Sequence, residues 1–204
     1  MTITTHPRKA LLTTLLALAA VLPWQQAAAA DKAAKASAAL QSLDGAMTPG
    51  EGQKRLDPMI GTFDVTVRVW TDPAKPPLEY RGGSVNAWTL GGRYVQTMLS
   101  TDMEGERFDG IGYYGFDNAT QTYQAAWMDN GSTAIGWYHG KMDKSGRSAL
   151  LKSSAIPAVG SKPVAVEMRV SIAEGGDHVT QLWGAPRGGK AFKFMELRSV
   201  RAKK

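Results

Sequence analysis

Apolar and polar residues alternate through much of the chain after residue 61. Every second position is apolar from Phe63 to Val69, and again from Val164 to Ile172. A period of two indicates strands with one buried face. Turn signals such as Asn130-Gly131 interrupt the pattern at short intervals, because these residues allow the positive φ angles of tight hairpins. The pattern predicts about ten strands, near residues 62–71, 78–90, 93–101, 107–117, 121–129, 133–142, 147–155, 163–174, 178–185 and 190–201.

These strands are expected to form one antiparallel sheet. No helix-length apolar period separates them, and parallel pairing needs long crossovers. A sheet of this size splits into a sandwich or closes on itself, and consecutive short hairpins favour closure, which removes exposed edges. We therefore predict an all-β, antiparallel up-and-down barrel with a short N-terminal helix. A β-sandwich stays open as an alternative. A membrane barrel, which is apolar on its outside, is disfavoured by the polar ending Ala202-Lys203-Lys204.

The first thirty residues have the order of a secretory signal. Arg8 and Lys9 precede the apolar run Ala10–Leu22, and small residues follow at Ala28 and Ala30. A basic start, a short apolar core and a small-residue cleavage site define such a leader. The apolar run is too short to span a bilayer of roughly 30 Å. We therefore predict cleavage after Ala30 and a bacterial periplasmic or secreted protein with no membrane span after cleavage.

A short helix is expected directly before the first strand. Thr48-Pro49-Gly50-Glu51 is typical of a helix start, and the helix would carry Leu56 and Met59 on one side. The Ala-rich residues before it present only a thin apolar face, which predicts a tether or a marginal helix. The predicted organisation is a signal peptide over 1–30, this tether over 31–47 and the barrel over 48–204.

Composition excludes several function classes. The chain has 204 residues, 24 Lys and Arg against 18 Asp and Glu, and no Cys. Without Cys there is no disulfide, no thiolate metal site and no Cys nucleophile. Loss of Arg8 and Lys9 with the leader lowers the net charge from +6 to +4. Since Lys and Arg are not clustered within the fold, the sequence does not predict a nucleic-acid-binding surface.

Gly61-Thr62-Phe63 stands at the start of the first predicted strand, directly after the short helix. A helix leading into Gly-x-aromatic resembles the calycin superfamily, which includes lipocalins and fatty-acid-binding proteins. In those barrels the aromatic residue closes the base and an Arg from the last strand lies across it. The resemblance implies that Gly61, Phe63 and Arg198 close the base of this barrel.

Three further segments resemble a secreted bacterial family catalogued as a domain of unknown function. They are Trp88–Tyr94, Phe108–Asp117 and Tyr123–Asp129, with the spacing Trp-x-Leu-Gly-Gly-Arg, Gly-x-Gly-x-x-Gly-Phe-Asp and Tyr-x-x-x-Trp-x-Asp. That family resembles calycin-like barrels, so the resemblance implies the same fold. It brings no established substrate.

The run Gly110-Ile111-Gly112-Tyr113-Tyr114-Gly115 has the spacing of a dinucleotide-binding motif. That motif works only between a strand and a helix, where the helix N-terminus meets the pyrophosphate. Here aromatic residues and a turn flank it. We therefore interpret these glycines as positions in a bent barrel strand beside bulky side chains.

The chain offers few residues for catalysis. Beyond the leader it has two histidines, His139 and His178, and no carboxylate or histidine spacing typical of a metal site. No Gly-x-Ser-x-Gly elbow is present, and no catalytic residue is predicted. The nitrobindins, ten-stranded barrels that the predicted fold resembles, bind haem through a His, which implies haem as an alternative ligand here. Otherwise both histidines are ordinary strand residues.

The interior is expected to be rich in aromatic residues. A barrel of ten strands can enclose a ligand, and an apolar cavity with a few polar groups is the usual form of a small-molecule site. If Phe192, Phe194 and Arg198 point inward, then period two also places Glu196 inside, where a carboxylate must be paired or protonated. The predicted ligand-binding residues are Tyr80, Ser84, Asn86, Trp88, Tyr123, Trp127, Trp137, His139 and Glu196.

Three functions follow from these observations. The first is the binding of a small apolar or amphipathic molecule inside a periplasmic barrel. The second is a haem protein or a His-dependent enzyme that uses His139 or His178. The third is a non-catalytic envelope protein that acts through its outer surface. The oligomeric state stays open.

Overall fold

The computed structural model describes residues 23–156, 159–186 and 188–203. The described part of the chain contains two α-helices, one 3-10 helix and ten strands. In chain order they are α1 (Pro23–Met47), α2 (Glu51–Lys54), η1 (Asp57–Met59), β1 (Gly61–Val69), β2 (Leu78–Thr89), β3 (Tyr94–Met103), β4 (Glu106–Asp117), β5 (Thr122–Asp129), β6 (Gly136–Met142), β7 (Ser148–Ala155), β8 (Val164–Ile172), β9 (His178–Gly184) and β10 (Phe192–Arg201).

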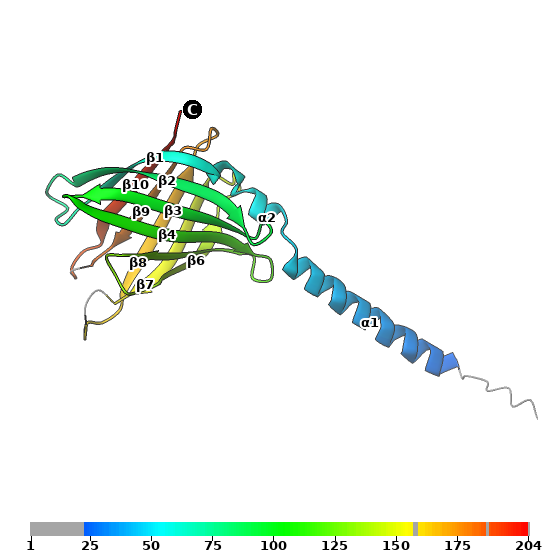
Figure 1. Cartoon of the computed structure of the whole chain (residues 1–204). Coiled ribbons are helices and arrows are strands. Elements are labelled where there is room, and N and C mark those ends of the chain that lie inside the picture. The colour runs from blue at the N-terminus through cyan, green and yellow to red at the C-terminus, as the bar shows by residue number, and fades with distance from the viewer. Residues whose placement is uncertain (1–22, 157–158, 187, 204) are drawn as a thin grey trace, which may run out of the picture. The chain divides into compact units, whose positions relative to one another are not determined.

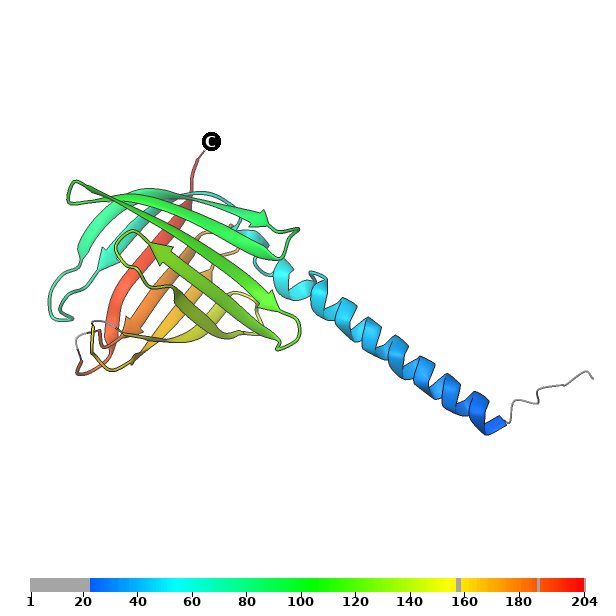
Figure 2. The same cartoon turned by 60° about the horizontal axis from the view of Figure 1, so that its bottom comes forward.

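The ten strands form a closed antiparallel barrel. Each strand pairs with its neighbours in the chain, and β1 pairs with β10 to close the sheet. Figures 1 and 2 show the strands wrapping around one interior, with the last strand lying beside the first. The predicted up-and-down barrel is thus confirmed, and the alternative β-sandwich is excluded because a single ladder runs through all ten strands.

The two-residue period places the apolar side chains inside this barrel. On β1 the inward side chains of Phe63, Val65 and Val67 are each at most 3% exposed. On β8 the same alternation buries Val166, Met168, Val170 and Ile172. Burying the apolar face of each strand in this way is the main contribution to stability that the alternating pattern makes.

α2 and η1 cover one end of the barrel, which we call the closed end. Leu56 and Met59 are almost fully buried there, and Asn86 on β2 donates to the Met59 carbonyl at 2.9 Å. Gln53 fixes α2 by accepting from the Gly50 amide and donating to the Phe116 carbonyl, both at 2.8 Å. Gly50, rather than the predicted Thr48, therefore precedes the helix.

The segment before the barrel is helical. α1 continues from the end of the predicted leader through the predicted tether, and its described side chains from residue 30 to residue 47 are exposed. The chain divides into two units, Met1–Leu43 and Asp44–Lys204. The basic and apolar parts of the predicted signal peptide lie outside the described residues. None of the described helices is long and apolar enough to cross a bilayer.

Candidate ligand-binding lumen

A buried aromatic pair stands at the closed end. Phe63 is 1% exposed, and its ring meets the His178 ring edge-on with 4.7 Å between the centroids. The guanidinium of Arg201 lies over the Phe63 ring at 5.0 Å. Arg201 also donates to three carbonyls, those of Pro58, Ile60 and Gly175, at 2.9–3.1 Å. The last strand therefore ties the short helices to the first strand.

Arg201 holds the position that the resemblance assigned to Arg198. Arg201 is the partner of Phe63 in the β1–β10 ladder, whereas Arg198 is the partner of Thr66 and points outward. The implied pairing of Phe63 with Arg198 is thus wrong, because the arginine opposite Phe63 lies three residues further along β10. Gly61 and Phe63 do lie at this end. Gly61 has a positive φ of 141°, and its missing side chain leaves room for the Arg201 head group, which a Cβ atom there would meet.

A bulge in β10 explains why Glu196 is not inside. The ladder between β10 and β9 shifts between Lys193 and Met195, so that Phe194 and Met195 both line the interior. Beyond the bulge the inward phase is reversed, and Glu196 faces out. The assumption that Phe194 and Arg198 share one face was therefore wrong, because a bulge inserts one extra residue into the alternation.

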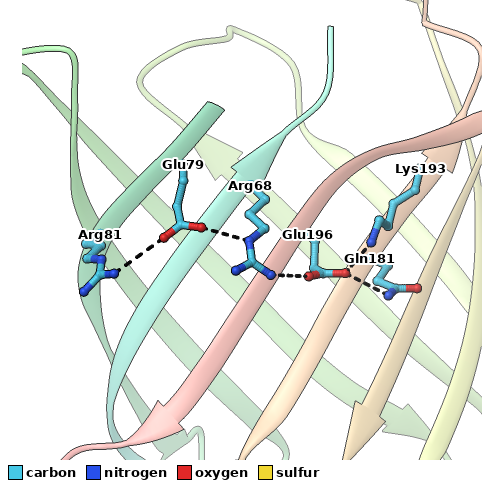
Figure 3. A network of polar contacts seen from close by, with 6 residues as sticks. All are labelled: Arg68, Glu79, Arg81, Gln181, Lys193 and Glu196. Carbon is cyan, nitrogen blue, oxygen red and sulfur yellow. Dashed lines mark hydrogen bonds and ion pairs between the residues drawn. The ribbon is translucent and has the colours of Figure 1, made fainter. Parts of the chain in front are cut away.

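Glu196 is part of a polar network on the outer face, drawn in Figure 3. Its carboxylate accepts from Lys193 at 2.6 Å and from Gln181 at 3.0 Å, and Arg68 lies 3.4 Å away. Arg68 continues the network to Glu79 at 3.0 Å. Burial alone raises the pKa of Glu196, but the Lys193 and Gln181 hydrogen bonds and the neighbouring cations outweigh it and lower the pKa. The network bridges the β1–β10 seam. It holds the Glu196 carboxylate on the outer face, where it cannot contact a ligand in the interior.

The interior half opposite the closed end holds a cavity of about 220 Å³, which we call the lumen. Most of its lining is apolar, and aromatic rings contribute from four strands. The lining residues are Val67, Leu99, Met103, Phe108, Tyr114, Trp127, Asp129, Tyr138, Ala155, Val166, Met168, Thr180, Leu182, Phe194, Met195 and Leu197. Two larger hollows, of about 330 and 770 Å³, lie around α2 outside the barrel. A third hollow, of about 470 Å³ and largely apolar, lies on the outer face of β2, β3 and β4. The lumen is the apolar cavity inside the barrel, which is where a small-molecule site is expected.

Trp127 forms one wall of the lumen, and two glycines on the neighbouring strand β4 make room for it. Its direct partners are Gly112 on β4 and Gly136 on β6. A Cβ atom at Gly110 would lie within 2.2 Å of the indole, and one at Gly112 within 2.9 Å. The Gly-x-Gly pattern thus accommodates a tryptophan, which confirms its interpretation as a barrel-strand feature.

The polar groups of the lumen surround the end of β5. Asp129 accepts from the Trp127 indole N–H at 2.8 Å and from the Gly131 amide at 3.1 Å. Burial raises the pKa of Tyr138, and the negative charge of Asp129 raises it further. Burial raises the pKa of Tyr114 to about 12, against a hydrogen bond with Thr180 that lowers it. Both phenols therefore stay neutral at physiological pH.

A smaller cavity of about 30 Å³ lies between the lumen and the closed end. It shares Leu99, Tyr114 and Trp127 with the lumen and has room for about one water molecule. The buried Thr97 hydroxyl on its wall has no hydrogen-bond partner among the described residues. His178 also reaches it, and the Nδ1 atom of His178 lies 3.0 Å from the Gly176 carbonyl. Because a carbonyl only accepts, Nδ1 carries the proton and Nε2 is the acceptor.

Most of the predicted site residues face inward, but at different depths. Trp127 alone of them lines the lumen. Ser84 lines the small cavity, and Asn86 is buried beside η1. The others form hydrogen bonds near the ends of the barrel: Tyr80 with Glu104, Trp88 with Asp57 and Tyr123 with the Gly52 carbonyl.

Trp137 and His139 point outward, contrary to their predicted phase. Trp137 is 66% exposed and His139 is exposed, whereas Tyr138 between them faces the lumen. Because Trp137 and Tyr138 are adjacent and both aromatic, the alternation of apolar residues does not show which of them faces inward on β6. The size of the partners decides it, because the inward Tyr138 faces the small Ala125 and the inward Gly140 faces Tyr123.

The described histidines do not fit a haem. His139 stands on the outer face. His178 borders a cavity of only about 30 Å³, and neither of these two described histidines lines the lumen. Among the described residues no group of His, Asp and Glu is arranged to hold a metal ion.

Asp129, Tyr114 and Phe108 line the lumen although they were not among the predicted ligand-binding residues. For Asp129, the pattern Tyr-x-x-x-Trp-x-Asp already indicated which way the side chain points. Its positions 123, 127 and 129 differ by even numbers, so all three side chains lie on one face of a strand. Once Trp127 is placed inside, Asp129 must be inside as well.

Comparisons with known proteins agree with this fold. The chain matches the family described as "Protein of unknown function (DUF1579)" over residues 48–201. It is similar to the structure titled "Crystal Structure of Rv2717c from M. tuberculosis", with a TM-score of 0.57 and 16% identity, over 76% of this chain and 100% of that chain. At this identity the likeness concerns the fold alone. Among curated proteins, none matches the chain.

Proposed function

Since the chain belongs to the DUF1579 family, whose description names no activity, we propose its function from the barrel itself: it binds a small, largely apolar molecule in the lumen. The observation that carries the proposal is the unfilled volume of about 220 Å³ behind an aromatic and aliphatic wall. Protein interiors are normally packed as densely as organic crystals. A cavity of this size therefore leaves dispersion contacts unmade, and an apolar ligand would supply them.

The volume sets the size of the ligand. An apolar cavity of roughly 150 Å³ binds benzene, and drug-sized ligands occupy pockets of about 300 Å³ or more. The lumen, at about 220 Å³, lies between the two. It suits a molecule of one or two rings, or a short branched chain. A long fatty acid does not fit entirely within it.

Calorimetry with 1-naphthol, an uncharged two-ring probe, tests the proposal. We expect Val166→Phe to weaken the affinity at least tenfold, because Val166 is buried on the lumen wall. Ala165→Phe is the matched control, since Ala165 is exposed on the outer face of the same strand. Absence of binding to the wild type at millimolar probe, or equal affinity of both variants, would overturn the proposal.

We propose further that the protein works in the bacterial periplasm. The support is the order of basic, apolar and small residues over positions 1–30. Native mass spectrometry of protein from the periplasm of its own host tests both proposals at once. The expected mass is that of a chain starting at Asp31 plus a small bound molecule. A chain that retains its first thirty residues contradicts export with cleavage.

A further inference from the structure

We propose that the lumen prefers a small organic cation, an amine with an apolar body, whose ammonium group binds between Asp129 and the aromatic wall. This inference rests on the proposed function and names the chemical class of its ligand. It follows from the charge of the lining, the geometry of one carboxylate and the rings around it.

The described lining of the lumen carries a single carboxylate and no basic side chain. Among its described residues Asp129 is the one carboxylate, and none is Lys, Arg or His. Transferring an anionic ligand into this cavity would bring two negative charges together in a medium of low dielectric constant, with no cation to compensate. A carboxylate ligand is therefore disfavoured, whereas an ammonium gains an attraction that a neutral ligand lacks.

The Asp129 carboxylate is held in place by its own hydrogen bonds. One oxygen accepts from the Trp127 indole N–H, and the other accepts from the Gly131 amide. Each carboxylate oxygen has a second lone pair. The side chain can therefore accept one or two further hydrogen bonds from an ammonium without losing the bonds that orient it. Hydrogen bonds between charged partners are about twice as strong as neutral ones.

Aromatic side chains lie near the same carboxylate. Trp127 precedes Asp129 by one strand period, and Tyr138 lies close enough for the Asp129 charge to raise its pKa. Phe108 lies beside Gly131 at the same rim of the lumen. The faces of such rings attract cations, and most strongly where water is excluded. The aromatic rings and the carboxylate thus both favour a positively charged ligand.

Three probes of nearly equal size test the inference: 2-phenylethylamine, 2-phenylethanol and phenylacetate. At neutral pH the first is a cation, the second is neutral and the third is an anion. We expect the amine to bind the wild type on the order of tenfold more tightly than the alcohol, and the anion to bind most weakly. Raising the salt concentration should narrow the gap between amine and alcohol only slightly, because the carboxylate is partly shielded from solvent.

Asp129→Asn is the informative variant. It should lower the affinity for the amine to that for the alcohol and leave the alcohol within about threefold of its wild-type affinity. Asp109→Asn is the matched control. Asp109 is on the outer face of the neighbouring strand, next to the ladder partner of Asp129, and pairs with Arg107 at 2.9 Å. Asp109→Asn therefore removes the same charge at the same height of the barrel, and it should leave the affinities for all three probes unchanged.

The possible results separate the two proposals. If the alcohol binds in a Val166-dependent manner but the amine binds no better, the inference is wrong while the lumen remains a binding site. If none of the three probes nor 1-naphthol binds, the proposed function fails. The comparison of the three probes on the wild type needs no variant, so it decides the inference even if Asp129→Asn does not fold.

Discussion

The two ends of the barrel interior are built in opposite ways. At the closed end, Phe63 is packed between His178 and Arg201, and the carbonyls of the short helices are bound by Arg201 and Asn86. In the other half, sixteen residues surround a cavity of about 220 Å³. The same strands run through both halves.

This difference separates stability from binding. A densely packed end loses free energy whenever an atom is removed, because the cavity left behind cannot collapse fully. A half that already contains a cavity has less to lose and can exchange its missing contacts for those of a ligand.

Truncation of a phenylalanine should produce the largest contrast. Phe63→Ala removes a ring that is 1% exposed and should destabilise the fold by about 3–5 kcal/mol. Phe108→Ala enlarges a cavity that already exists and should cost less than about 2 kcal/mol. Urea unfolding followed by circular dichroism measures both. Equal losses would mean that the lumen is as tightly packed as the closed end.

A methyl group added to glycine should give the next largest contrast. At Gly140, in the closed half, a Cβ atom would lie 2.0 Å from the Leu150 carbonyl oxygen, which is backbone. At Gly110 it would meet the Trp127 ring, which has the lumen on its other side. We expect Gly140→Ala to cost about 3 kcal/mol and Gly110→Ala about 1 kcal/mol.

For ligand binding, the ranking of these two variants should be reversed, with the larger loss of affinity in Gly110→Ala. Gly110→Ala pushes Trp127 into the lumen and should abolish 1-naphthol binding, whereas Gly140→Ala should leave the affinity of the folded fraction unchanged. Loss of binding in Gly140→Ala alone would contradict the division between the two halves.

The fold could be predicted from the sequence because its signal is repeated in every strand. The alternation on β1 and β8 and the hairpin residues between strands each point to the same closed sheet. An error at one boundary, such as placing the helix start at Thr48 instead of Gly50, leaves the topology unchanged. A fold can be predicted from sequence when many local signals indicate the same structure.

The site was harder to predict because a shift of one residue in the alternation of a strand reverses which side chains face inward. The bulge between Lys193 and Met195 reversed the faces of Glu196 and Arg198. Nothing within β10 marks a bulge there. On β6 the adjacent aromatics Trp137 and Tyr138 gave no period, and only the size of their partners on β5 decides which one is inside.

Replacing the arginine at the closed end should have a moderate effect. Arg201→Met removes the donor to three carbonyls and the cation over Phe63, although the side chain is partly exposed. We expect a loss of about 1–2 kcal/mol. Arg198→Met is the control on the same strand, because Arg198 faces solvent, and it should stay within about 0.5 kcal/mol of the wild type. The opposite ranking in urea unfolding would restore Arg198 as the closing residue.

The smallest expected effect is a pH dependence that belongs to the closed end. Burial lowers the pKa of His178 below its ordinary value of 6.5, and the charge of Arg201 adds to this, although the Gly176 carbonyl and Asp177 oppose it. The unfolded chain therefore binds a proton on this histidine more readily than the folded one. The stabilisation by neutral His178 is complete above pH 6.5 and is lost as the pH falls through and below that value.

Unfolding free energies measured between pH 7.5 and pH 5 test this assignment. The wild type should lose stability over that interval, and His178→Gln should lose less, because the residue that gains the proton on unfolding is gone. His139→Gln serves as the control, since His139 is exposed on the outer face and should keep the wild-type slope. If His178→Gln and the wild type have the same slope, the acid sensitivity comes from elsewhere in the chain. A reduced slope in His178→Gln alone locates it at the packed end, away from the lumen where the ligand is proposed to bind.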